Sequence, residues 1–145
     1  MKRALFIALI AVVTARGYRA YAHHSIAATY IQGQQISIEG DLVSLMFRNP
    51  HSQVQCDGVA KNDKTQTTYR WTVEWSSGSQ LAHEHVTQDS LKLGDRVVIT
   101  GNPGRNPAEH RLRMLSIRRL SDGWRWISGP FMYNGGRRRA HRSTL

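Results

Sequence analysis

Short runs in which apolar and polar residues alternate constrain the fold of this chain more than any other feature. The clearest run is TYRWTVEW, Thr68–Trp75, in which Tyr69, Trp71, Val73 and Trp75 share one face and the residues between them are polar. Alternation with a period of two predicts a β-strand with one face buried and the other in water. We therefore expect these four side chains to face a hydrophobic core.

Four further segments have strand character. In order along the chain they are Gln35–Phe47, His51–Val59, Asp89–Gly101, which begins with a turn, and His110–Leu120. The positions expected to face inward are Val54, Cys56, Val97 and Ile99. Gly40 interrupts the first run and predicts a β-bulge or a sharp bend there. The last run alternates imperfectly, so its inward face is less clearly defined.

Between the third and fourth strands the period changes from that of a strand to that of a helix. The segment SGSQLAHEHV is expected to form one or two helical turns, with Ser79 as the N-cap. Five strands, a glycine bend in the first strand and a short helix before the fourth match a small, partly open barrel of the OB type. Another small all-β barrel or sandwich is the alternative, because it would have the same strand count.

Length and charge bound the organisation of the chain. Its 145 residues allow one domain, and its formal net charge is +10. That charge is unevenly distributed: residues 23–110 carry 7 basic and 9 acidic side chains, whereas residues 111–145 carry 9 arginines and one aspartate. The predicted barrel body is therefore slightly acidic. An argument for nucleic-acid binding would have to rest on the C-terminal part alone.

The front of the chain has the pattern of an export signal. Lys2 and Arg3 precede the apolar run Ala4–Thr14, and Ala20 and Ala22 fit the small-x-small rule for cleavage. We expect cleavage after Ala22, or alternatively after Ala20, and export to a bacterial periplasm or beyond. An uncleaved membrane anchor is the other alternative. The expected organisation is a signal peptide over 1–22, the barrel over 23–126 and an Arg-rich, disordered tail over 127–145.

Several short motifs, in this order and spacing, resemble one family. They are HHS after the signal segment, NPH at Asn49–His51, DSLKLGD at Asp89–Asp95, GNPGRNPAEHRLR from Gly101 and SDGW from Ser121. Together they are similar to the exported bacterial proteins grouped as domain of unknown function 6152, from about Ala22 to Trp126. The resemblance implies export and a small β-rich domain. It brings no activity with it, and it draws attention to His23, His24 and His51.

Cleavage after Ala22 would make His23 the first residue, with a free amine and an imidazole that can chelate copper(II) together. Nitrogen donors in a tetragonal arrangement suit this ion. His51, at a strand start behind Pro50, is the candidate for a third nitrogen ligand. Glu74, on the polar face of its strand, is a candidate axial ligand or a partner of a ligand. His24 is either a competing ligand or a bystander. Another divalent metal is the alternative to copper.

Other functional classes have weaker support in the sequence. The hydrolase, phosphate-binding and Cys-x-x-Cys motifs are missing from the sequence, so an enzyme is expected only if a bound metal supplies the chemistry. Cys56 is expected to be a buried apolar residue. A metal-free barrel that binds a small ligand or a protein partner remains the main alternative, and nucleic acid is not expected. The tail arginines, Arg137, Arg138, Arg139 and Arg142, could instead contact a membrane surface.

Overall fold

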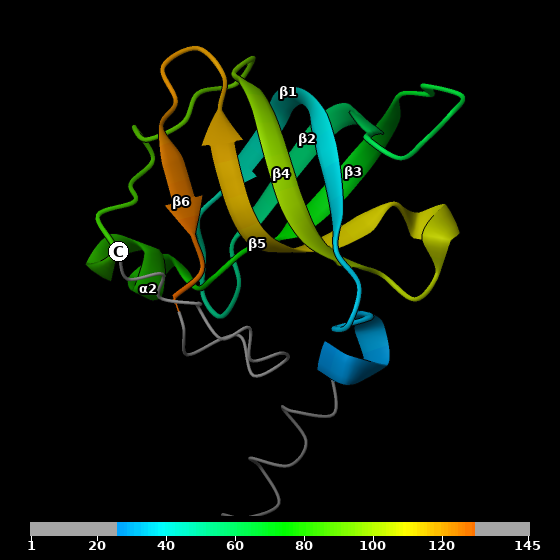
Figure 1. The fold of residues 1–145 in the computed structure, drawn as a ribbon. Coiled ribbons are helices and arrows are strands. Elements are labelled where there is room, and N and C mark those ends of the chain that lie inside the picture. Colours follow the sequence, from blue (N-terminus) through cyan, green and yellow to red (C-terminus); the bar gives the residue numbers. More distant parts are fainter. Residues whose placement is uncertain (1–25, 130–145) are drawn as a thin grey trace, which may run out of the picture.

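Six β-strands form one sheet in the computed structural model, which describes residues 26–129 (Figure 1). They are β1 (Ile36–Met46), β2 (Gln53–Ala60), β3 (Tyr69–Glu74), β4 (Arg96–Pro103), β5 (Arg111–Arg119) and β6 (Arg125–Ile127). A helix, α2 (Gly78–His83), lies between β3 and β4, and a 3-10 turn, η1 (Pro107–Glu109), precedes β5. Residues 26–29 are also helical, which the sequence had not suggested. Within residues 26–129, none of the helices has the length and apolar character needed to span a membrane.

The sheet closes on itself. Its strand order is β3-β2-β1-β4-β5-β6, and β3 also pairs with β5 in parallel, Thr72 to Glu74 against Arg111 to Arg113. Strands β1 to β5 therefore form a closed five-stranded barrel, and all their other pairings are antiparallel. With α2 between β3 and β4, this arrangement confirms the expected all-β, OB-like barrel.

The barrel core is made by the inward faces predicted from the alternation. Trp71 and Val73 on β3, and Trp75 directly after it, are at most 7% exposed. The other strands contribute Ile38, Leu42, Val54, Cys56, Val97, Ile99, Leu112, Met114 and Ile117. The prediction was wrong for Tyr69, which is 38% exposed and stacks on the ring of His110 at 4.0 Å. Tyr69 is the first residue of β3, so its side chain lies at the end of the barrel.

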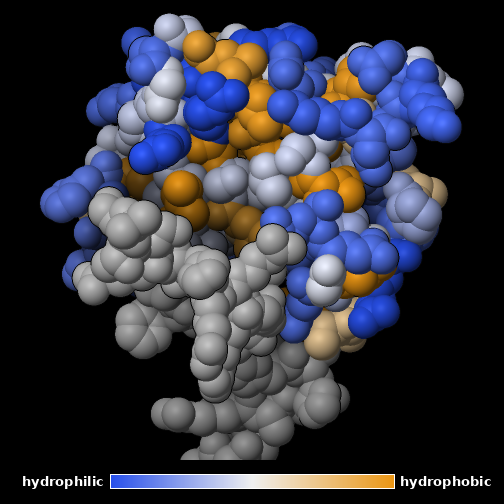
Figure 2. All heavy atoms as spheres, viewed as in Figure 1, coloured by the Kyte–Doolittle hydropathy of each residue, from blue (hydrophilic) through white to orange (hydrophobic). Residues whose placement is uncertain are grey.

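The outer surface is mixed in character. Figure 2 shows small apolar groups among predominantly hydrophilic side chains on the face seen in Figure 1. The exposed large apolar residues of the described chain are Met46, Tyr69, Leu93, Leu120 and Ile127. Apolar residues scattered over a surface in this way are ordinary for a folded domain.

Gly40 has a different role from the predicted one. It pairs regularly with Gly58 on one side and Val97 on the other, and the irregularity in β1 comes later, between Leu42 and Ser44. A Cβ atom added at Gly40 would lie 2.1 Å from the carbonyl oxygen of Asp57. The glycine is therefore needed because the backbones of β1 and β2 approach closely, while the bulge forms three residues further on.

A second irregularity explains the imperfect alternation of β5. Met114 pairs with Gly101 and Ser116 with Thr100, so Leu115 is the extra residue of a bulge. The inward positions are consequently Leu112 and Met114 before the bulge and Ile117 after it. The extra residue changes the spacing of buried side chains from two to three.

Helix α2 begins two residues earlier than its sequence suggested. Ser77, rather than Ser79, is the N-cap: its backbone is extended, and its hydroxyl accepts the N–H of Gln80 at 3.2 Å. Ser79 lies inside the first turn, where Asn49 Oδ1 accepts its N–H at 3.2 Å. The predicted helix therefore exists, but the residue that caps it is different.

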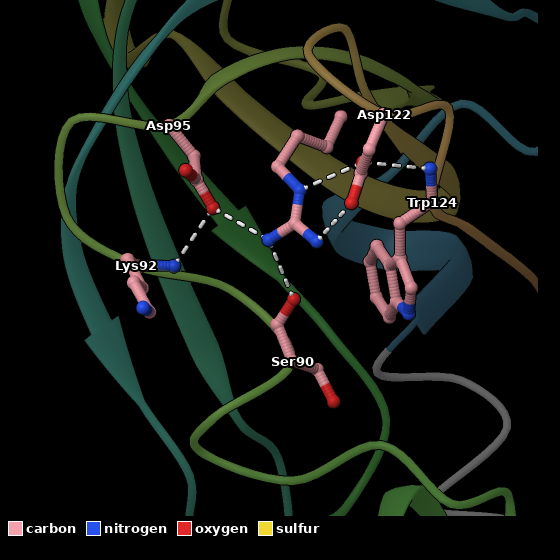
Figure 3. A network of polar contacts seen from close by, with 6 residues as sticks. Ser90, Lys92, Asp95, Asp122 and Trp124 are labelled. Atoms are coloured by element: carbon pink, nitrogen blue, oxygen red, sulfur yellow. Dashed lines mark hydrogen bonds and ion pairs between the residues drawn. The ribbon is translucent and has the colours of Figure 1, made fainter.

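A sixth strand was not foreseen. β6 pairs with Ser116 to Arg118 of β5 and places Trp126 in the core at 7% exposure. The turn before β6 is held by Arg119, whose bonds to the labelled Ser90, Asp95 and Asp122 are among the dashed lines in Figure 3. Its guanidinium donates two hydrogen bonds to Asp122, at 2.9 and 2.7 Å, and one to Asp95 at 3.0 Å. It also donates to the carbonyl oxygen of Ser90, and thereby ties the loop before β4 to the β5–β6 turn.

Candidate functional site

The site predicted from His51 and Glu74 lies at one end of the barrel. In Figure 1 the loop before β2, the helix α2 and the helical residues 26–29 all lie at this lower end. Residue 51 is in the loop, and residue 74 ends β3. Hydrogen bonds between Ser52 and residues 75 and 76 extend the β2–β3 ladder and bring the loop beside the end of β3.

The N-terminal part of the described chain is fixed to the same end. Tyr30 forms an isolated antiparallel bridge with Gly104. Arg105 secures the helical turn, because its N–H donates to the carbonyl oxygen of Thr29 and its Nε to that of Ala27, at 2.9 and 2.8 Å. Residues 26–30 are therefore anchored to the barrel, with the Tyr30 side chain directed inward at 2% exposure.

Three side chains from different parts of the chain form a contact series. The Tyr30 hydroxyl donates a hydrogen bond to Glu74 Oε2 at 2.8 Å. The other carboxylate oxygen, Oε1, lies 3.4 Å from His51 Nδ1. The side-chain exposure rises along the series, from the buried tyrosine to 26% at Glu74 and 55% at His51. The structure thus brings together two of the four predicted metal-site residues and leaves the imidazole open to solvent.

The electrostatics of the series favour a protonated tyrosine beside a carboxylate. Burial raises the pKa of Tyr30 well above its usual range, and the hydrogen bond to Glu74 raises it further. Arg111 acts in the opposite direction on this pKa. The Arg111 Nη1 lies 3.5 Å from Glu109 Oε2, and its Nε is buried without a hydrogen-bond partner. Tyr30 is therefore a hydrogen-bond donor to Glu74 at physiological pH.

Two pockets meet at His51 and Glu74. A polar pocket of about 300 Å³ is bounded by both residues together with Tyr30, Arg48 and Arg111. A larger pocket of about 470 Å³ is bounded by both residues on one side and by an aromatic wall on the other. Because His51 bounds both pockets, a ligand bound in either pocket would be able to contact its imidazole ring.

The larger pocket forms where β3 and β6 each pair with only part of β5. β5 pairs with β3 up to Arg113 and with β6 from Ser116, so neither strand covers Met114. Trp75 and Trp126 lie beside this gap with their rings edge-on at 5.3 Å, and Trp126 Nε1 donates a hydrogen bond to Glu84. The gap in the barrel wall is therefore lined by indole rings and rimmed by polar groups.

His23 and His24 lie outside the described residues, as do Arg137, Arg138, Arg139 and Arg142. Within residues 26–129 there is no group of three or more histidine, cysteine, aspartate or glutamate side chains that could hold a metal.

Two residues of the site were missed by the sequence reasoning. Tyr30 lies 44 positions before Glu74, and Arg111 lies in a strand chosen only for its apolar pattern. The available signal was the pair of large residues Tyr30 and Ile31 in the stretch AATYIQG, whose other residues are small or polar. Cys56, in contrast, is buried as expected, and burial raises its pKa to about 12.

Comparisons with known proteins identify the family of this chain. The mitochondrial single-stranded DNA-binding protein Rim1 of S. cerevisiae is similar in crystal structure, with a TM-score of 0.44 and 14% sequence identity over 64% of this chain and 100% of that chain. No curated protein gives a significant match. A family model matches residues 10–113, a range that includes His23, His51 and Glu74. The chain therefore belongs to the family of unknown function DUF6152.

Proposed function

We propose that the protein is an exported β-barrel module that binds copper(II), or a similar divalent metal, through His23 and His51. In this proposal cleavage after Ala22 leaves His23 as a free N-terminal residue, in the periplasm or outside the cell. Its amine and imidazole supply two nitrogen donors, and His51 supplies the third. Copper(II) favours nitrogen ligands in a tetragonal arrangement.

The observation that carries the proposal is the contact series from Tyr30 through Glu74 to His51. It joins the anchored N-terminal segment to the one predicted histidine ligand that the structure describes. His23 precedes Tyr30 by seven residues, four of which, residues 26–29, are helical. The proposal requires residues 23–25 to carry the N-terminal amine to the exposed imidazole of His51.

The first experiment is a copper titration of protein that begins at His23, with binding measured by calorimetry and by electron paramagnetic resonance. We expect close to one equivalent of tightly bound copper(II). His51→Ala should weaken binding and remove one nitrogen from the spectrum, whereas His83→Ala, at an exposed position of α2, should leave both unchanged. An extra methionine before His23 should weaken binding because it removes the terminal chelate.

The control variants decide the outcome. Equal affinities for the unaltered protein and His51→Ala would remove His51 from the site, and indifference to the added methionine would remove the terminal amine. Export and cleavage are tested separately by the intact mass of protein recovered from the exporting cell. A mass that corresponds to a first residue other than His23 would contradict the terminal chelate.

The aromatic pocket favours a second candidate function, metal-independent binding of a small apolar ligand. Its wall contains Trp75 and Trp126, and a volume of about 470 Å³ is within the range of small-molecule sites. Binding of anilinonaphthalene sulfonate to metal-free protein, followed by tryptophan quenching, tests this candidate. Trp126→Leu should reduce the signal, and an unchanged signal would exclude the pocket.

A further inference from the structure

We propose that Tyr30 is a positioning residue for His51: acting through Glu74, it holds the imidazole so that Nε2 is the atom presented to a metal. The orientation of the ring is a property of the metal-free protein. Its consequence for metal affinity rests on the function proposed above. The inference also assigns Glu74 as an orienting group rather than a direct ligand.

The first step concerns the two oxygens of Glu74. A carboxylate accepts hydrogen bonds and donates none, so the hydroxyl of Tyr30 must be the donor at Oε2. The second oxygen, Oε1, is the nearer one to His51, at 3.4 Å from Nδ1. A neutral imidazole carries one proton, and a carboxylate facing Nδ1 favours the tautomer in which that nitrogen is protonated. The lone pair is then on Nε2.

The second step concerns which members of the series can move. Tyr30 is buried at 2% exposure, and its backbone bridges to Gly104. Glu74 lies on β3 with its backbone paired on both sides, to Gln53 and to Arg113. His51, at 55% side-chain exposure, has the fewest restraints of the three. The buried tyrosine therefore holds the carboxylate in place, and the carboxylate in turn restrains the imidazole.

The third step concerns the effect on metal binding. Histidine ligands commonly donate their second ring nitrogen to a carboxylate, which fixes the ring and increases its basicity. Removing such an outer partner typically weakens metal affinity by about 10–100-fold. With the Tyr30 hydroxyl bonded to Oε2 and the His51 ring 3.4 Å from Oε1, the carboxylate faces the ring and need not bind the metal itself.

The test begins with metal-free protein labelled with ¹⁵N in the histidine rings, at about pH 8, where model histidine side chains are neutral. In the unaltered protein the His51 ring should show an unprotonated Nε2. Tyr30→Phe and Glu74→Ala should each shift the ring toward the Nε2-protonated form. Tyr69→Phe, at an exposed tyrosine on the same barrel, is the matched control and should change nothing.

The double variant separates positioning from a general structural effect. If Tyr30 acts through Glu74, Tyr30→Phe should have no further effect on the ring when Glu74 is already alanine. Copper affinity should fall by about 10–100-fold in each single variant, with the same number of nitrogen donors in the spectrum. Circular dichroism confirms that each variant is folded.

The outcomes of the positioning role and of copper binding are distinguishable. An unprotonated Nδ1 in the unaltered protein, or a ring unaffected by Tyr30→Phe, would overturn the positioning role even if copper binds. Failure to bind copper with the expected ring tautomer intact would instead overturn the proposed function.

Discussion

Replacing Gly40 by alanine should destabilise the barrel strongly. The new Cβ would lie 2.1 Å from the Asp57 carbonyl oxygen and 2.4 Å from the Cα of Gly58. Both contacts are with backbone, and β1 is paired with β4 on its other side, so the strand cannot move aside without loss of ladder hydrogen bonds. Overpacking costs about 1–3 kcal/mol, and each lost hydrogen bond adds about 1 kcal/mol. The lower entropy of the unfolded alanine chain offsets about 0.5–1 kcal/mol of this.

The expected net loss is therefore about 2–4 kcal/mol, which corresponds to a fall of about 10–20 °C in melting temperature for a domain of this size. Thermal unfolding followed by circular dichroism measures it. Gly33→Ala is the matched control, because a Cβ there meets nothing within 4 Å and the residue has no positive φ. If Gly40→Ala melted within a few degrees of Gly33→Ala, the close approach of β1 and β2 would be refuted as the reason for the glycine.

Two further predictions concern titrating groups. The Cys56 thiol is buried, and burial raises its pKa to about 12. It should therefore resist iodoacetamide in the folded protein at pH 8 and react once urea unfolds the protein. Rapid labelling of the folded protein would contradict its burial. Hydrogen bonds from Arg119 lower the pKa of Asp122 to about 2. The stabilisation that this carboxylate provides is therefore present above about pH 4 and is lost as the pH falls toward 2. Arg119→Met should therefore lower stability at pH 7 and flatten the acid part of the urea-unfolding profile, and an acid profile as steep as that of the unaltered protein would count against this role.

Much of the fold could be predicted because the barrel wall has one buried face. Val54, Cys56, Val97 and Ile99 alternate with partly exposed residues, and this pattern predicted the strands that contain them. The β6 strand has only three residues, too few for a period to be recognised. The place of the irregularity in β1 was also predicted wrongly. A glycine in a strand indicates either a bulge or a close backbone contact, and the sequence does not show which of the two applies at Gly40.

The candidate site was predicted only in part. His51 was proposed from its residue type and its expected place at a strand start, and Glu74 from its place on a polar strand face. The structure places His51 in the loop before β2, and the sequence pattern did not predict the β2–β3 register that brings the two residues together. The contact from Tyr30 joins residues 44 positions apart, and no periodicity links them. Whether His23 completes the site remains a prediction, because that residue is outside the described range.

The C-terminal strand β6 affects whether two copies of the protein can pair edge to edge. β6 covers Ser116 to Arg118, a stretch of β5 edge that β3 does not reach. An uncovered strand edge is a template on which another chain can add a strand. A chain truncated after Asp122 would keep all five barrel strands and yet expose that edge beside the apolar Met114. In the described residues the free edge is instead that of β6, which has only three residues, and a very short edge strand is a poor template for another chain.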